Sequence, residues 1–296
     1  MRLPPLIQAM RPEQWTKNAI VGAAWVFAFG DQTQSPPQGA WLRVGLAMFC
    51  FCLISSAVYL MNDLVDRELD QAHPGKKSRP IASGRLSPRK AFKFLLLLAG
   101  LPLVGAMAFS LPLATVLTAY MLLQVAYSLF LKTIPIVDVL VLSAGFVLRA
   151  LAGAVVIPVH VSPWLLGCTF TLALFLALCK RHHEKSVLRL KEDIARPSLR
   201  NITAPTLNRL IDISIIATGL CYLAYTLSAD TQAKYGDRRM LFTFPWVAYG
   251  ILRYRRLVHK NQQGGRPEKQ LFADRHLIAA FCLYVLTLLI LFQVPN

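Results

Sequence analysis

Long apolar runs separated by clusters of positive charge constrain this chain more than any other feature. Hydrophobic residues make up 55% of the 296 residues. Several strongly apolar runs, such as 42–61 and 136–157, approach or exceed the roughly 18 residues that mark a membrane-spanning helix. Soluble proteins do not carry such runs at this density. We therefore predict an all-α integral membrane bundle of nine transmembrane helices in one domain over 1–296. The expected helices are 18–30, 41–62, 90–109, 112–131, 136–157, 163–180, 207–228, 240–254 and 275–293.

The distribution of Lys and Arg predicts the orientation of the bundle. The chain has 32 Lys and Arg but only 15 Asp and Glu, and most of these cations lie in alternate connecting segments. Because cytoplasmic loops are enriched in Lys and Arg, we expect a multi-pass protein of the inner (cell) membrane whose N-terminus and acidic motif are cytoplasmic. Cations that alternate with apolar runs argue against nucleic acid as a partner. The segment 1–17 has three prolines and no apolar core, so we expect no signal peptide.

A group of acids ends the apolar run 42–61. On one helix, Asn62, Asp63, Asp66 and Asp70 would fall within roughly a 100° arc that also holds Tyr59. Mg²⁺ prefers oxygen ligands and commonly takes one or two carboxylates together with substrate phosphates. The alternative is a solvated helix end with mixed charge. We favour a magnesium site, because ionisable residues placed against apolar sequence are costly and usually functional.

Basic residues follow the acids at once. Lys76, Lys77 and Arg79 lie in the segment 67–93, which we interpret as a cytoplasmic lid whose cations hold a phosphate that Mg²⁺ also binds. The alternative is a polybasic patch attracted to anionic lipid, at about 1 kcal/mol per cation. Lys17, at the start of the first expected span, either contacts the ligand as well or lies at the membrane interface beside Trp15.

The second half of the chain adds more cations. Tyr127 and Lys132 end the fourth expected helix, and Lys180 ends the sixth. Arg149 lies inside the fifth, where a lone Arg costs about 2.5–3.5 kcal/mol unless it is paired or hydrated. It either pairs with Asp138 or a helix end, or faces a polar cavity that receives an anion. Together, these features suit a transfer from a diphosphate-bearing donor to a substrate with a long lipid tail.

The acidic motif Asn62-Asp63-x-x-Asp66-x-x-x-Asp70 and the basic segment after it resemble the first motif of the UbiA superfamily of membrane prenyltransferases. The resemblance covers essentially the whole chain. It implies nine transmembrane helices around a central cavity open to the cytoplasmic side. Those enzymes carry a second Asp-x-x-x-Asp pair for a second Mg²⁺, whereas here Asp138 is followed four residues later by Leu142. This departure suggests that the second half binds an anion directly.

This pattern resembles the decaprenyl-phosphate phosphoribosyltransferase branch of that superfamily. The branch motifs Arg-Pro-x-Gln-Trp-x-Lys-Asn, Tyr-Ser-x-x-Leu-Lys and Gly-Phe-x-x-Arg-Ala are matched at 11–18, 127–132 and 145–150. The resemblance implies transfer of 5-phosphoribose from phosphoribosyl diphosphate to a polyprenyl (decaprenyl-type) phosphate with release of diphosphate. In mycobacteria this reaction supplies the arabinose donor for the cell wall.

The resemblance also implies roles for individual residues. Asn62 and Asp66 would bind Mg²⁺, with Asp63 and Asp70 as supporting acids. The donor would contact Lys17, Tyr59, Lys76 and Arg79. The lipid phosphate or the ribose 5-phosphate would contact Tyr127, Lys132, Arg149 and Lys180.

Three other functions stay open on the sequence. A UbiA-type prenyltransferase that moves a prenyl group to an aromatic or other acceptor would need a second carboxylate pair. A transporter of anionic metabolites would commonly show inverted repeats, which the sequence does not show clearly. A non-catalytic scaffold would leave the acids without a purpose. The expected partners are the two substrates and the lipid bilayer. A homo-oligomer is compatible with the sequence, which does not set the oligomeric state.

Overall fold

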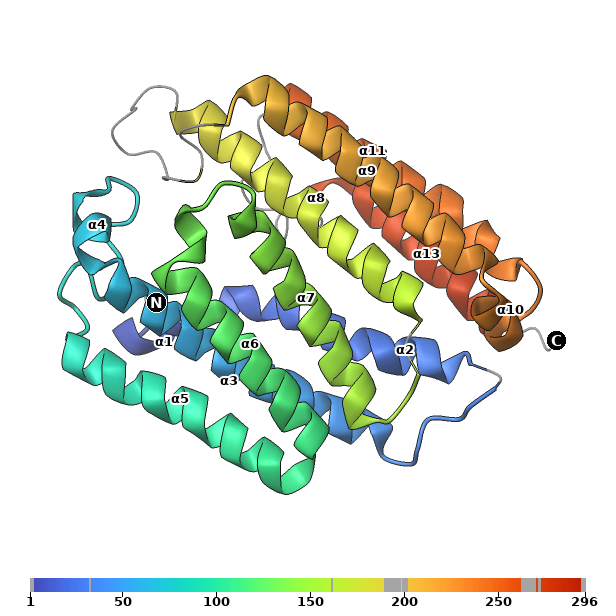
Figure 1. Cartoon of the computed structure of the whole chain (residues 1–296), viewed down its shortest axis with the longest axis horizontal. Helices are drawn as coiled ribbons and strands as arrows, with labels where there is room; N and C mark the ends of the chain where they lie inside the picture. Colours follow the sequence, from blue (N-terminus) through green and yellow to red (C-terminus); the bar gives the residue numbers. More distant parts are fainter. Residues whose placement is uncertain are drawn as a thin grey trace. The chain divides into compact units, whose positions relative to one another are not determined.

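All regular secondary structure in the part of the chain that the computed structural model describes is helical (Figure 1). The described residues are 3–31, 33–160, 162–188, 198, 202–261, 270 and 273–293. The chain forms two compact units. The first unit contains Met1–Ala23, Gly39–Lys132 and Leu148–Pro158, and the second contains Ala24–Gln38, Thr133–Val147 and Val159–Asn296. The single domain and the central cavity stay predictions.

Seven helices among the described residues are long and apolar enough to cross a membrane. They confirm the predicted all-α membrane class and overlap seven of the expected spans, although the helix expected at 163–180 continues to residue 188. The count of nine transmembrane helices is not confirmed. The seven are α3 (Ala40–Val65), α5 (Pro88–Phe109), α6 (Leu111–Leu129), α7 (Val137–Val156), α8 (Pro163–Leu188), α9 (Ala204–Leu227) and α13 (Arg275–Gln293).

The other two expected spans differ from the prediction. The segment 18–30 is divided between a 3-10 helix, η1 (Pro12–Gly22), and the short α2 (Ala23–Phe29). The segment 240–254 begins as another 3-10 helix, η5 (Arg239–Thr243), and continues as α11 (Phe244–Asn261). Charged residues in the second half of α11 explain why it does not qualify as an apolar span. The remaining short helices are α1 (Pro5–Met10), α4 (Arg67–Ala72), η2 (Leu131–Thr133) and α10 (Ala229–Tyr235).

Three of the long helices begin with a hydroxyl cap followed by proline. The side chains of Ser87, Ser110 and Thr203 accept hydrogen bonds from backbone amides three residues later, at the starts of α5, α6 and α9. Each cap satisfies one amide that has no partner inside its helix. A proline in the first turn needs no such partner, and its fixed φ suits the helix. These local signals set the starts of the spans.

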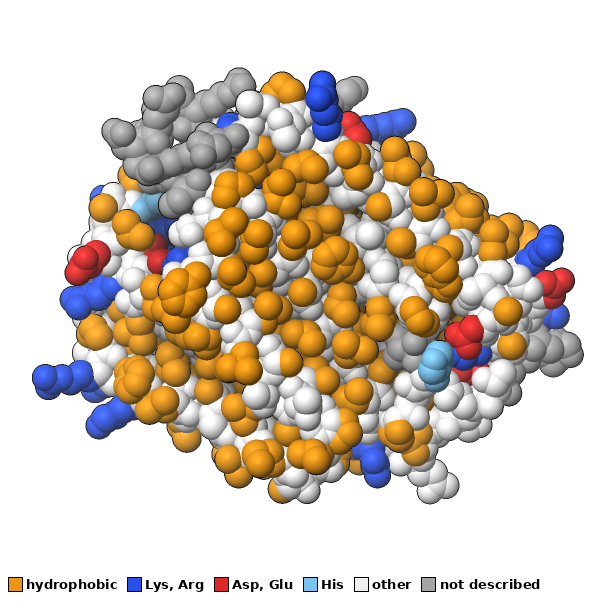
Figure 2. Space-filling view, viewed as in Figure 1, with side chains coloured by type: hydrophobic (Ala, Val, Ile, Leu, Met, Phe, Trp, Pro, Cys, Tyr) orange, Lys and Arg blue, Asp and Glu red, His pale blue; other side chains and the backbone are white. Residues whose placement is uncertain are grey.

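Helix α3 is the centre of the first unit. It packs against α1, η1, α5 and α6. Its buried cluster includes Leu60, and it also takes in Ile81 and Leu86 from the predicted lid. The outward side of α5 is apolar, with Leu101 61% and Val104 68% exposed. Hydrophobic side chains likewise cover much of the face drawn in Figure 2, as expected of helices that face lipid.

The second unit is built from long helices that lie side by side. Helix α8 packs along α9, and α11 packs along α13, as Figure 1 also shows. Phe175 of α8 and Ile211 of α9 are almost fully buried in its core. A second cluster, around Tyr222 and Tyr225, packs near the other end of α9. This unit positions Asp138, Lys180 and the residues of the α10 region.

Candidate active site

The acidic motif lies at the C-terminal end of α3 and continues into α4. The expected single helix is interrupted, because α3 ends at Val65 and Asp66 leaves the helical conformation at φ −91° and ψ 12°. The backbone pattern nevertheless continues across the break. The amide of Asp66 donates to the carbonyl of Asn62 at 2.9 Å, and that of Asp70 donates to the carbonyl of Asp66 at 2.8 Å. Asn62, Asp66 and Asp70 therefore still follow one another at a spacing of one turn.

Asp63 and Asp70 are buried and paired with arginine. Arg11 Nη2 lies 2.5 Å from Asp63 Oδ1, and Arg79 Nη1 lies 3.1 Å from the same oxygen. Arg79 Nη1 also lies 2.6 Å from Asp70 Oδ2, and Lys76 Nζ lies 3.8 Å from Asp70 Oδ1. The carboxylate side chains are only 2% exposed. Charge pairs of this kind fix the geometry of both partners, so these two acids hold the basic segment against α3.

Asn62 and Asp66 instead contact the end of α6. Ser128 Oγ donates a hydrogen bond to Asn62 Oδ1, and Lys132 Nζ lies 2.5 Å from Asp66 Oδ1. Asp66 is the most accessible carboxylate of the motif, with 24% of its side chain exposed. The four acidic-motif residues thus divide into two pairs with different partners.

The predicted lid, 67–93, is shorter as a loop than expected. Its first residues form α4 and its last residues open α5, so the connection between helices is 73–87. Within it, Ile81 and Leu86 are buried against α3. His73 Nδ1 accepts a hydrogen bond from the amide of Gly75 at 3.1 Å. Burial lowers the pKa of His73, and the neighbouring Lys76 ammonium lowers it further. The lid role stays a prediction.

Three further predicted residues belong to the unit that holds the acidic motif. The Tyr59 ring lies under Arg11, whose guanidinium carbon is 4.8 Å from the ring centre. Lys17 is half-buried on η1, which Trp15 ties to α3 through a 3.0 Å hydrogen bond to Ser56 Oγ. Tyr127 is buried on α6, next to Ser128 in sequence.

Arg149 is enclosed by polar and aromatic side chains. Its Nε donates to Asn18 Oδ1 at 2.8 Å, and its Nη2 donates to Tyr120 Oη at 2.7 Å. The guanidinium also lies over the rings of Tyr120 and Phe51. The side chain is buried, with 7% of the residue exposed. These contacts hydrogen-bond the guanidinium inside the first unit, and both alternatives for Arg149 stay predictions.

Asp138 pairs with Arg181, the residue that follows Lys180 on α8. Arg181 Nε lies 2.7 Å from Asp138 Oδ2, and both side chains are 3% exposed. Ser198 Oγ donates to the same oxygen at 3.2 Å, and Arg181 also contacts Glu184 at 2.6 Å. Lys180, the residue before Arg181, belongs to this second unit and not to the unit that holds the acidic motif.

The donor atoms at the acidic motif fit a magnesium ion shared with a ligand. Among the described residues, no three His, Cys, Asp or Glu side chains lie close enough to hold a metal ion by themselves. Mg²⁺ seldom needs such a cage, since it usually takes one or two carboxylates and fills its other positions with water and substrate phosphates. Asn62 and the accessible Asp66 supply two oxygens of this type. The orphan Asp63 Oδ2, which is buried and has no hydrogen-bond partner within the described part of the chain, adds a nearby acceptor.

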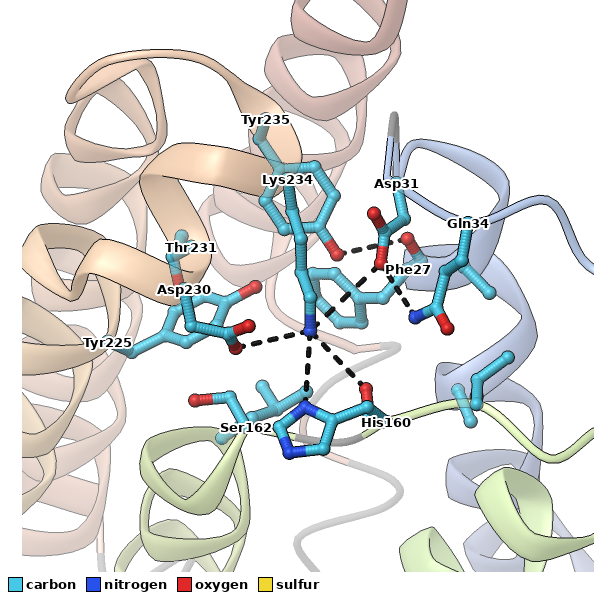
Figure 3. A pocket seen from close by; sticks show the side chains of 14 residues that line it. Phe27, Asp31, Gln34, His160, Ser162, Tyr225, Asp230, Thr231, Lys234 and Tyr235 are labelled. Atoms are coloured by element: carbon cyan, nitrogen blue, oxygen red, sulfur yellow. Dashed lines mark hydrogen bonds and ion pairs between the residues drawn. The ribbon is translucent and has the colours of Figure 1, made fainter.

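Sequence reasoning missed two groups of residues. Arg11 and Ser128 fall inside the matched motifs 11–18 and 127–132, and that position is the signal that could have found them. The second group surrounds Lys234 in a small cavity of about 30 Å³ in the second unit (Figure 3). Lys234 Nζ lies 3.1 Å from Asp230 Oδ2, 4.0 Å from Asp31 Oδ2 and 3.4 Å from the carbonyl of His160. These residues come from segments far apart in sequence, and no motif connects them.

Comparisons with known proteins agree on one family. The profile of the UbiA prenyltransferase family matches residues 19–281. A decaprenyl-phosphate phosphoribosyltransferase of Mycolicibacterium smegmatis is 36% identical over 225 residues, which is 76% of this chain and 71% of the relative. The protein of that name from Corynebacterium glutamicum is 32% identical over 281 residues, covering 92% and 82%. The solved structure of a UbiA homolog from Archaeoglobus fulgidus bound to GPP and Mg²⁺ is 17% identical with a TM-score of 0.73, covering 98% of this chain and all of the other. This structural likeness supports the fold.

Proposed function

Because the chain belongs to the UbiA prenyltransferase family and is a membrane transferase, we propose that it moves 5-phosphoribose from phosphoribosyl diphosphate to a polyprenyl phosphate and releases diphosphate. The similarity to relatives named decaprenyl-phosphate phosphoribosyltransferase carries this proposal, because it extends over most of the chain. The charges at the acidic motif support it. Four cationic side chains pair with three carboxylates there, which leaves a site suited to a polyanionic donor.

The donor would bind at the acidic motif. Asn62 and Asp66 would hold Mg²⁺, which neutralises the charge that develops on the departing diphosphate. Lys76 and Arg79 would contact the diphosphate from the basic segment, where Asp63 and Asp70 position Arg79. Lys17 and Tyr59 would contact the rest of the donor. The four acidic-motif residues would thus divide into metal ligands and positioning residues.

The acceptor would be held by cations that follow the acidic motif and the basic segment along the chain. Lys132 is partly accessible and would contact the lipid phosphate directly. Arg149 is enclosed by Asn18 and Tyr120, so it would position η1 and α6 around the site. Tyr127 would support the end of α6. The role of Lys180 at the lipid phosphate or the ribose 5-phosphate stays a prediction.

The reaction would be a direct displacement at the anomeric carbon. A lipid-phosphate oxygen forms the new bond to that carbon while the bond to the diphosphate oxygen breaks, with oxocarbenium character between the two. The acceptor phosphate is already ionised at neutral pH, so the chain need not supply a strong general base. Its residues would position the two substrates and stabilise the leaving charge. Inversion at the anomeric carbon follows from this geometry.

The alternative reaction is prenyl transfer from a prenyl diphosphate to an aromatic or other acceptor. Leu142 stands where the second carboxylate of a second metal site would be, and Asp138 is paired with Arg181. Both observations favour phosphoribosyl transfer. The test is to incubate the purified protein and Mg²⁺ with phosphoribosyl diphosphate and decaprenyl phosphate, or with a prenyl diphosphate and 4-hydroxybenzoate. Diphosphate release only with the first pair supports the proposal, and release only with the second pair contradicts it.

We also propose that the protein lies in the inner (cell) membrane with the acidic motif in the cytoplasm. The distribution of Lys and Arg supports this orientation. Single cysteines are placed in the 73–87 connection or in the 229–239 region of a cysteine-free variant. An impermeant thiol reagent added to intact cells should label the 229–239 position and not the 73–87 position. Labelling of the 73–87 position in intact cells would contradict the orientation.

A further inference from the structure

One segment contacts both of the residues that we propose as metal ligands. Ser128 Oγ donates to Asn62 Oδ1, and Lys132 Nζ lies 2.5 Å from Asp66 Oδ1. The spacing is four residues on each side, so the segment 128–132, from the end of α6 into η2, faces the segment 62–66 at the end of α3. Ser128 is fully buried, which makes this contact part of the packed interior of the first unit. The end of α6 is therefore fixed next to the proposed metal ligands.

Lys132 and a divalent cation cannot bind Asp66 independently. The Lys132 ammonium lies directly on Asp66 Oδ1, and a metal ion on the same carboxylate would lie within a few ångströms of it. At that distance two positive charges repel strongly in a partly buried site. Neighbouring acids offer Lys132 little alternative, because Asp63 and Asp70 already hold Arg11, Arg79 and Lys76. Metal binding at Asp66 must therefore weaken or break the Lys132–Asp66 pair.

The Lys132 side chain can move once a metal ion binds Asp66. Its side chain is 18% exposed, and it lies in η2, just beyond the C-terminal end of α6. A lysine has a flexible stem and three donors, so it can reach another anion without moving the backbone. Ser128, which is buried on α6, would keep the segment in place during this exchange.

We propose that Lys132 competes with the metal for Asp66 and that the displaced ammonium then binds the phosphate of the acceptor lipid. The proposal rests on the proposed function and makes a single residue responsible for the order of binding. The metal and the diphosphate-bearing donor bind first, and the lipid phosphate binds tightly only afterwards. The ammonium keeps its three protons throughout, and no covalent bond changes in the exchange.

Metal binding tests the competition directly. Full-length protein in nanodiscs is titrated with Mn²⁺ in the presence of inorganic diphosphate, and free Mn²⁺ is measured by electron paramagnetic resonance. We expect Lys132→Met and Lys132→Gln to bind Mn²⁺ about threefold to fivefold more tightly than the wild type, as expected for loss of a partly exposed competing pair. Arg43→Met, which removes an exposed cation at the start of α3, away from the acidic motif in sequence, is the matched control and should not change the affinity. Unchanged or weaker Mn²⁺ binding by both Lys132 variants, with both still folded, would overturn the proposal.

Lipid-phosphate binding tests the second step. The probe is fluorescent farnesyl phosphate, measured with and without Mg²⁺ and diphosphate. In the wild type, metal and diphosphate should increase its affinity several-fold. In Asp66→Asn, where Lys132 has lost its partner, the probe should bind tightly without them. An Asp66→Asn variant that binds the probe no better than the wild type without metal would contradict the exchange.

These two binding assays contain no phosphoribose, so their outcome is independent of the transfer reaction. Competition at Asp66 without phosphoribosyl transfer would retain the exchange and reject the proposed donor. Phosphoribosyl transfer without competition would retain the proposed function and reject the exchange.

Discussion

The buried Arg181–Asp138 pair gives the sharpest prediction about what holds the second unit together. Both side chains are 3% exposed and their charged atoms lie 2.7 Å apart. Removing one partner leaves the other charge buried, which costs about 3–5 kcal/mol. We therefore expect Arg181→Met to destabilise the protein, because it removes the guanidinium that faces the buried Asp138 carboxylate.

The expected change is large enough to measure by thermal unfolding in detergent. At about 2 °C per kcal/mol for a chain of this size, Arg181→Met should lower the Tm by roughly 6–10 °C. The double variant Asp138→Leu/Arg181→Met removes both charges and keeps most of the volume, and such replacements are often neutral. It should recover most of the lost stability. Glu184 would lose its contact in both variants, but its side chain is 26% exposed and can be hydrated.

Two results would refute this reasoning. A Tm of Arg181→Met within about 2 °C of the wild type would mean that the pair carries less than about 1 kcal/mol. A double variant as unstable as Arg181→Met would mean that the geometry of the pair, and not its charge balance, stabilises the unit. The double variant should also keep its diphosphate release, since neither residue contacts a substrate in the proposed reaction. Its loss would assign Asp138 a part in the chemistry.

Three more predictions follow from single contacts. Lys234→Met should lower the Tm by several degrees, because it removes the buried cation that faces Asp31. Lys234→Arg keeps the charge and should lower the Tm less. An unchanged Tm in Lys234→Met would contradict this. Asp274→Ala should cost about 0.5–2 kcal/mol, because Asp274 Oδ1 accepts the amides of the first turn of α13. The Arg253 guanidinium and these amides hold the pKa of Asp274 below its ordinary value of 3.8. The stability lost in Asp274→Ala should therefore be complete above that pH and shrink as the pH falls below it. A loss of stability that grows in acid would contradict this. Asp66→Ala should abolish metal-dependent diphosphate release, and normal turnover in this variant would remove the proposed metal role.

Most of the helices could be predicted from the pattern of apolar residues along the chain. Helix α13 matches its expected bounds, and α7 differs by one residue at each end, because an apolar run in lipid has few alternatives to a helix. The patterning failed where hydrophobicity does not decide the conformation. The segment 18–30 is partly 3-10, and α11 carries charges that partner Asp212 and Asp274.

The candidate site could be predicted in composition but not in pairing. The spacing of Asn62, Asp66 and Asp70 survives the break after Val65, because the backbone hydrogen bonds continue across it. The partners of the acids could not be read from the chain. Lys132 and Asp66 are 66 residues apart, and Arg181 and Asp138 are 43 apart. Such contacts depend on how helices pack, which local patterns do not encode.

The most direct measurement is the structure of the product. Purified protein, Mg²⁺, phosphoribosyl diphosphate labelled with ¹³C at the anomeric carbon and decaprenyl phosphate should give a lipid-linked 5-phosphoribose, with diphosphate released in equal amount. NMR of the isolated lipid should show the anomeric configuration inverted relative to the donor. A prenylated product, release of diphosphate without a phosphoribosyl lipid, or a retained configuration would contradict direct displacement at the acidic motif.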